Sequence, residues 1–143
     1  MNMQGCAVSK GTLITGVIGD DVHVTGIRIL EHALREAGFN VVSLGIQVGQ
    51  EEFVNAAVET KADAILVSSL SGHAKILVEG LKGRCVEAGL KEVRLYLGGQ
   101  LIIGEMRWED QEKIFRDMGF DRVYPPIAMP EQVVEDLKAD LKL

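Results

Sequence analysis

The chain has 143 residues, of which 47% are apolar and 25% are charged, a composition typical of one soluble globular domain and unlike that of disordered, collagen-like or coiled-coil proteins. Its 21 acidic residues outnumber its 15 lysines and arginines, and the net charge of −6 argues against a nucleic-acid-binding role, which needs a basic face. No apolar stretch reaches the roughly 18 residues that span a bilayer, and residues 1–10 lack the apolar core of a signal peptide.

Short β-rich runs alternate with segments of helical spacing along the chain. The first strand is predicted over 12–18, and the helix that follows over 27–37 is closed by Gly38. The later strands are predicted over 41–46, 64–67, 93–97 and 121–124. The later helices are predicted over 51–61, 74–88 and 108–118, with a last helix that opens at Pro130.

Four of these helices, all except the one over 108–118, carry an apolar stripe that we expect to face inward. The expected inward residues are Ile27, Leu30, Leu34, Ala37, Phe53, Val54, Ala57, Val58, Leu77, Leu81, Cys85, Ala88, Val133, Val134, Leu137 and Leu141. Strands that alternate with helices predict an α/β fold, a three-layer, doubly wound, five-stranded parallel sheet. The preferred strand order is the flavodoxin-like 2-1-3-4-5, and residues 1–143 are expected to form a single domain.

Ligands of such sheets bind beyond the carboxyl ends of the strands. Three predicted loops meet at that edge. They are the loop 19–26 after the first strand, the loop 68–73 after the third, and Gly98-Gly99 after the fourth.

Asp21 and His23 are the candidate metal-binding pair of the first loop. Residues two apart in an extended segment project to the same side, so the carboxylate can accept a hydrogen bond from one imidazole nitrogen and leave the other free to bind a metal. On these two residues alone, the simpler interpretation is that Asp21 caps the next helix and His23 is solvated. Asp20-Asp21 also resembles the acidic pair of phosphoacceptor receiver domains, but the Asp and Lys that those domains need are replaced by Ser68-Ser69 and Val123-Tyr124.

The other two loops offer small residues. Ser68 and Ser69 end a buried strand, where a hydroxyl can bond to a ligand or satisfy the backbone of the turn. Gly98-Gly99 is either a tight turn or a place where a flat ligand lies against the backbone. A flavin-phosphate loop is excluded because the first loop carries acids and Val22 in place of hydroxyls.

Taken together, Asp21-x-His23-x-x-Gly26, Ser68-x-Leu70 and Gly98-Gly99 resemble the cobalamin-binding domain of corrinoid enzymes in which a histidine replaces the cofactor's own base on cobalt. Within that superfamily, the chain looks like the small subunits of glutamate mutase. The stretches that carry this closer resemblance are 59–63, 67–70, 98–104 with Trp108, and 118–126.

The resemblance implies a role for each residue of the motif. His23 would be the axial ligand of cobalt in adenosylcobalamin, and Asp21 would hydrogen-bond its other nitrogen. The displaced nucleotide tail would enter between the first and third strands, with Ser68 against its base. The cofactor-binding residues it implies are Asp20, Asp21, Val22, His23, Val24, Thr25, Gly26, Ser68, Ser69, Leu70, Gly98, Gly99 and Gln100.

The resemblance also implies an isomerase that interconverts L-glutamate and (2S,3S)-3-methylaspartate through radicals. It implies a partner as well, a large barrel subunit that binds the substrate, in a heterotetramer of two small and two large chains. A corrinoid carrier of a methyltransferase, or the cobalamin subunit of another mutase, is the alternative. Cys6 and Cys85 form neither a disulfide framework nor a zinc motif, so we expect a reducing, cytoplasmic setting.

Overall fold

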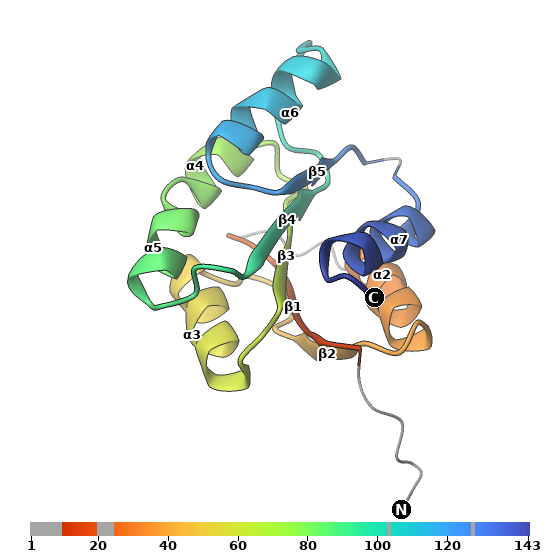
Figure 1. Cartoon of the computed structure of the whole chain (residues 1–143). Helices are drawn as coiled ribbons and strands as arrows, with labels where there is room; N and C mark the ends of the chain where they lie inside the picture. Colours follow the sequence, from red (N-terminus) through yellow and green to blue (C-terminus); the bar gives the residue numbers. More distant parts are fainter. Residues whose placement is uncertain (1–9, 20–24, 103, 127) are drawn as a thin grey trace, which may run out of the picture.

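The computed structural model describes residues 10–19, 25–102, 104–126 and 128–143. Its centre is a five-stranded parallel sheet in the order β2-β1-β3-β4-β5, which confirms the predicted fold and topology (Figure 1). The strands are β1 (Thr12–Val17), β2 (Asn40–Ser43), β3 (Ala64–Ser68), β4 (Arg94–Gly98) and β5 (Arg122–Tyr124). The helices are α2 (Thr25–Glu36), α3 (Gln50–Thr60), α4 (Ala74–Val78), α5 (Leu81–Glu87), α6 (Trp108–Asp117) and α7 (Pro130–Asp140).

Helices cover both faces of the sheet and so make three layers (Figure 1). On one face, α2 and α7 pack beside each other over a core that includes Leu13, Leu34 and Tyr96. On the other face, α3 to α6 enclose a second core around Ile14 and Phe53. Because both faces are covered, β1 and β3 are buried along nearly their whole length, as central parallel strands are.

The prediction of one continuous helix over 74–88 is wrong, because this segment forms two helices, α4 and α5. The break falls at Gly80, whose φ of 84° takes the backbone into the left-handed region. The Gln50 side-chain amide, at the start of α3, donates to the carbonyls of Leu77 at 2.7 Å and Glu79 at 2.9 Å. This glutamine therefore satisfies carbonyl groups that the interrupted helix leaves without an internal donor.

Three smaller expectations also fail. Val58 is 44% exposed because it lies at the edge of the apolar stripe that Phe53 and Ala57 centre. Ala88 is exposed because α5 ends one residue before it. The second strand stops at Ser43 instead of residue 46, because the chain turns at Gly45, where φ is 83°.

Cys85 is a packing residue on α5. The thiol is free and fully buried in the larger core, and this burial raises its pKa. A thiol held protonated in apolar surroundings is a poor nucleophile and metal ligand. Among the described helices, none combines the length and the apolar character that crossing a bilayer requires.

Candidate functional site

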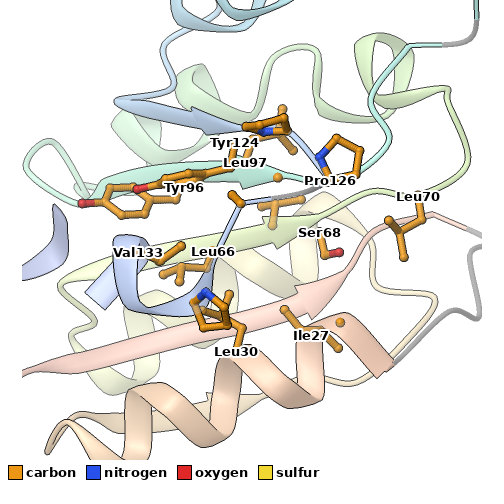
Figure 2. A pocket seen from close by; sticks show the side chains of 17 residues that line it. Ile27, Leu30, Leu66, Ser68, Leu70, Tyr96, Leu97, Tyr124, Pro126 and Val133 are labelled. Carbon is orange, nitrogen blue, oxygen red and sulfur yellow. The ribbon is translucent and has the colours of Figure 1, made fainter. Parts of the chain in front are cut away.

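An apolar pocket of about 160 Å³ lies at the carboxyl ends of the strands, on the face covered by α2 and α7 (Figure 2). One wall comes from Ile27 and Leu30 of α2, and the opposite wall from Val133 of α7. A single water needs only about 10–15 Å³ measured in this way, so the pocket has room for a ring system. The described lining residues are Gly26, Ile27, Leu30, Leu66, Val67, Ser68, Leu70, Tyr96, Leu97, Gly98, Gly99, Tyr124, Pro125, Pro126, Ala128, Pro130 and Val133.

Five residues of the sequence-predicted site meet at this pocket: Gly26, Ser68, Leu70, Gly98 and Gly99. Ser68 is the last residue of β3, and Leu70 lies in the loop that follows it. The side chains of Ser68 and Leu70 lie near each other at one end of the pocket (Figure 2). The loops after β3 and β4 and the first turn of α2 therefore converge at one edge, as the strand-end argument predicts.

Position 99 requires a glycine, because its backbone conformation and the close approach of the neighbouring loop leave no place for a side chain. Its φ of 118° is one that side chains rarely adopt, and a Cβ there would lie 2.3 Å from the carbonyl oxygen of Ser69. At Gly98 a Cβ would lie 3.4 Å from Cβ of Tyr124. The two glycines let the loops after β3 and β4 approach closely and so form the end of the pocket.

Two predicted residues lie away from the pocket lining. Ser69 is fully buried, and its hydroxyl has no hydrogen-bond partner in the described structure. Gln100 is exposed and donates to its own loop, to the carbonyl of Ile102 at 3.3 Å.

The route expected for the tail, between the first and third strands, stays a prediction. β1 and β3 pair continuously from Leu13 with Ala64 to Val17 with Ser68, which leaves no gap between these strands. The pocket lies instead on top of the sheet, between the two helices of one face.

The cobalt-ligand candidates of the first loop, Asp20, Asp21, Val22, His23 and Val24, lie outside the described residues. Thr25 begins α2, and Gly26, in the same first turn, lines the pocket. His23 therefore precedes the pocket by three residues in the sequence.

Two tyrosine rings that the sequence analysis did not single out form part of the pocket wall. Tyr96 and Tyr124 lie on adjacent strands with ring centroids 5.9 Å apart and planes tilted by 53°. The Tyr124 hydroxyl donates to Asp136 Oδ2 at 2.6 Å, and the Tyr96 hydroxyl donates to Asp140. Burial is the main cause that raises the pKa of each phenol, and the aspartate it bonds to adds to the effect. Both phenols are thus held as neutral hydrogen-bond donors.

Comparison with known proteins decides the family. Residues 11–123 match the family model described as the B12 binding domain. The glutamate mutase sigma subunit of Clostridium tetani is 52% identical over 136 residues, which are 95% of this chain and 99% of that protein. The glutamate mutase sigma subunit of Carboxydothermus hydrogenoformans is 55% identical over 131 residues, 92% of this chain and 96% of that protein.

The chain belongs to the glutamate mutase sigma subunits. A solved structure of a cobalamin-binding protein from Desulfitobacterium hafniense superposes with a TM-score of 0.72 over 91% of this chain and 58% of that one. At 19% identity, that likeness establishes a common fold only. This sigma subunit therefore combines a flavodoxin-like sheet with an apolar pocket at the edge where such sheets bind ligands.

Proposed function

We propose that this chain binds adenosylcobalamin and is the cofactor-holding half of an isomerase that interconverts L-glutamate and (2S,3S)-3-methylaspartate by a radical mechanism. The observation that carries the proposal is the apolar pocket between α2 and α7, in a chain that shares half its residues with glutamate mutase sigma subunits. We further propose that the whole chain acts as one cobalamin-binding domain in the cytoplasm. A single sheet with a core on each face supports the proposal of one domain. The free thiol of Cys85 supports the proposal of a cytoplasmic location.

The pocket fits the base at the end of the cofactor's nucleotide tail. Leu30, Leu66 and Val133 present apolar surface, and the rings of Tyr96 and Tyr124 add flat aromatic surface. The two phenol hydroxyls already donate to Asp136 and Asp140. The Ser68 hydroxyl is therefore the side-chain group that we propose to hydrogen-bond a polar atom of the base. Such walls suit a largely apolar bicyclic ring with one hydrogen-bonding edge.

The loop 20–24 is proposed to hold the cobalt. His23 binds the metal through one ring nitrogen, and Asp21 accepts a hydrogen bond from the other, which fixes the tautomer and raises the basicity of the ligand. Asp20, Val22 and Val24 flank these two residues, and Thr25 and Gly26 lead from the loop into α2. When bound, adenosylcobalamin supplies the radical by homolysis of its cobalt–carbon bond.

Catalysis is proposed to need a large barrel subunit, in a heterotetramer of two chains of each kind. The described pocket lining includes no lysine or arginine that could hold a dicarboxylate. Arg122, behind the pocket, is already paired with Asp136 and Asp140. We propose that the partner subunit binds the substrate, while this chain orients the corrin and shields its lower face from water.

The test is the identity of the nitrogen on cobalt. The protein is loaded anaerobically with adenosylcobalamin, reduced to the cobalt(II) form and examined by electron paramagnetic resonance. We expect the nitrogen splitting of the cobalt lines to change when the protein carries ¹⁵N-histidine. This sensitivity to the label should disappear in His23→Ala and persist in His32→Ala, since His32 is exposed on α2 and pairs with Glu36 at 3.4 Å. If ¹⁵N-histidine leaves the nitrogen splitting of the unchanged protein as it was, the cofactor's own base still binds the metal, and the proposal is contradicted.

A further inference from the structure

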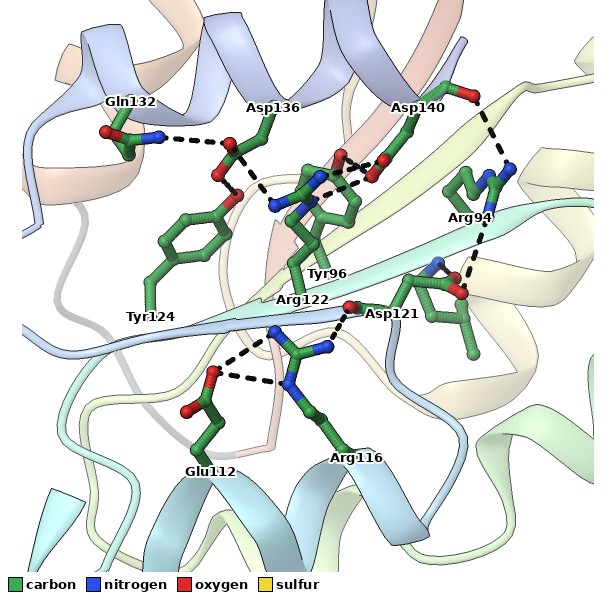
Figure 3. A network of polar contacts seen from close by, with 11 residues as sticks. Arg94, Tyr96, Glu112, Arg116, Asp121, Arg122, Tyr124, Gln132, Asp136 and Asp140 are labelled. Carbon is green, nitrogen blue, oxygen red and sulfur yellow. Dashed lines mark hydrogen bonds and ion pairs between the residues drawn. The ribbon is translucent and has the colours of Figure 1, made fainter. Parts of the chain in front are cut away.

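The helix that forms one wall of the pocket is fastened to the sheet by ion pairs. Arg122, on β5, donates from Nε to Asp140 Oδ2 at 3.0 Å and from Nη2 to Asp140 Oδ1 at 2.9 Å (Figure 3). Its third nitrogen lies 3.3 Å from Asp136 Oδ1, one helical turn earlier on α7. One guanidinium therefore holds two successive turns of the helix.

The same two carboxylates also accept the tyrosine hydroxyls. Asp136 takes the hydroxyl of Tyr124 and Asp140 that of Tyr96, and both rings line the pocket. The two aspartates thus connect the aromatic surface on β4 and β5 to the helix that carries Val133. Three residues, called the cluster below, lie behind the pocket wall and do not line the pocket: Arg122, Asp136 and Asp140.

The geometry makes this a rigid connection. The side chains of Arg122, Asp136 and Asp140 are 32%, 14% and 16% exposed, so the charges are largely shielded from water. Two-point pairing of a guanidinium with a carboxylate fixes direction as well as distance. Gln132 extends the cluster by donating to Asp136 Oδ1 at 3.0 Å, and Arg94 by donating to the carbonyl of Asp140 at 3.4 Å.

We propose that Arg122, Asp136 and Asp140 are positioning residues that set the distance between α7 and the two tyrosine rings, and with it the width of the pocket. This rests on the proposed function, because the width matters only to a ligand that inserts a ring there. The cluster touches neither the corrin nor the tail. It acts by keeping Val133 and Pro130 at a fixed separation from Tyr96 and Tyr124.

The test compares two corrinoids that differ only in the tail. Dissociation constants are measured by equilibrium dialysis for adenosylcobalamin and for adenosylcobinamide, which has the same ring and upper ligand but no nucleotide. We expect Arg122→Lys, which keeps the charge but loses the two-point pairing, to weaken binding of adenosylcobalamin about tenfold and to leave adenosylcobinamide unchanged. Tyr124→Phe, which removes one hydroxyl and keeps the ring, should act in the same direction with a smaller effect, about threefold.

Arg116→Lys is the matched control. Arg116, on α6, pairs with Glu112 at 3.1 Å and donates to the carbonyl of Asp121 at 2.7 Å, on the opposite face of the sheet (Figure 3). This variant should bind both corrinoids as the unchanged protein does.

Each other outcome overturns the inference, and the outcomes are distinguishable. If the unchanged protein prefers adenosylcobalamin and both variants keep that preference, the positioning role is wrong while the proposed function stands. If the variants lose affinity for both corrinoids equally, the cluster serves only general stability. If the unchanged protein binds adenosylcobalamin and adenosylcobinamide equally well, the proposed function is wrong, and this inference is wrong with it.

Discussion

Thr15 and Glu31 form a buried hydrogen bond between the first strand and the helix beside it. Thr15 Oγ1 donates to Glu31 Oε2 over 2.6 Å, and the residues are 0% and 2% exposed. Glu31 lies on α2, one turn after Ile27, which lines the pocket. A carboxylate in this position would be costly without a partner, so the bond helps to fix where α2 sits on the sheet.

Thr15→Val should therefore destabilise the protein by about 1–3 kcal/mol, the cost of leaving a buried acceptor without its donor. Urea unfolding followed by circular dichroism measures the change. Thr60→Val is the control, because the Thr60 hydroxyl is exposed and bonds only to Ala56 in its own helix. That substitution should change stability by no more than about 0.5 kcal/mol. Equal effects at the two positions would show that the Thr15–Glu31 bond contributes nothing particular.

Gly99→Ala and Gly83→Ala should have opposite effects. At Gly99 the φ of 118° and the Ser69 oxygen 2.3 Å from the new Cβ should cost more than about 2 kcal/mol. Cobalamin affinity should fall as well, because the end of the pocket must shift. Gly83 lies within α5 with no atom near its added Cβ, so alanine there should raise stability by about 0.5–1 kcal/mol. Thermal unfolding of the pair checks the sign, and a tolerated Gly99→Ala would contradict the close approach of the two loops.

The Arg122–Asp140 pair should make stability sensitive to acid. The hydrogen bond from Arg122 is the largest cause that lowers the pKa of Asp140. A carboxyl with a lowered folded pKa contributes fully above its unfolded value of about 3.9, and loses that contribution as pH falls toward the folded value. Below about pH 4, Asp140→Asn should thus lose stability less steeply than the unchanged protein.

The matching control for acid sensitivity is Asp117→Asn, which breaks an exposed pair with Lys113 at 3.2 Å. Exposed pairs contribute about 0–1 kcal/mol, so this variant should follow the unchanged protein. The measurement is a series of urea midpoints between pH 2.5 and 7. If Asp140→Asn tracks the unchanged protein throughout, Asp140 does not supply the acid-sensitive stability.

Asp21→Asn tests the proposed relay to cobalt. Loss of a carboxylate that orients a metal-binding histidine costs about 10–100-fold in affinity or activity. We expect that loss in adenosylcobalamin affinity, with Asp117→Asn, at an exposed carboxylate on α6, as the control of equal charge change. A loss below about twofold at Asp21 would make it a helix cap.

Local patterns in the sequence predict the sheet and one end of the pocket. The alternation along β3 places Leu66 and Ser68 on one face, and the pairing of β3 with β4 brings Gly98 beside Ser68. Periodicity reports the alternation within one strand, and the strand order follows from the general rules for parallel sheets whose strands alternate with helices. Their part in binding the cofactor remains a prediction.

Contacts between distant residues are what the sequence could not show. The break after α4 depends on Gln50 reaching carbonyls that lie 27 and 29 residues later. The pocket wall likewise depends on Tyr96 reaching Asp140, 44 residues away. The spacing within either segment does not indicate such a pair, because the two partners belong to different elements.

The two walls of the pocket come from opposite parts of the sequence, α2 near its beginning and α7 after all five strands. A ribosome that has already synthesised α2 and the sheet has still not produced the second wall. Because a domain of this size generally folds as one cooperative unit, the pocket forms only after α7 has been synthesised and has packed beside α2. Loading of any ligand into this pocket therefore follows the synthesis of α7.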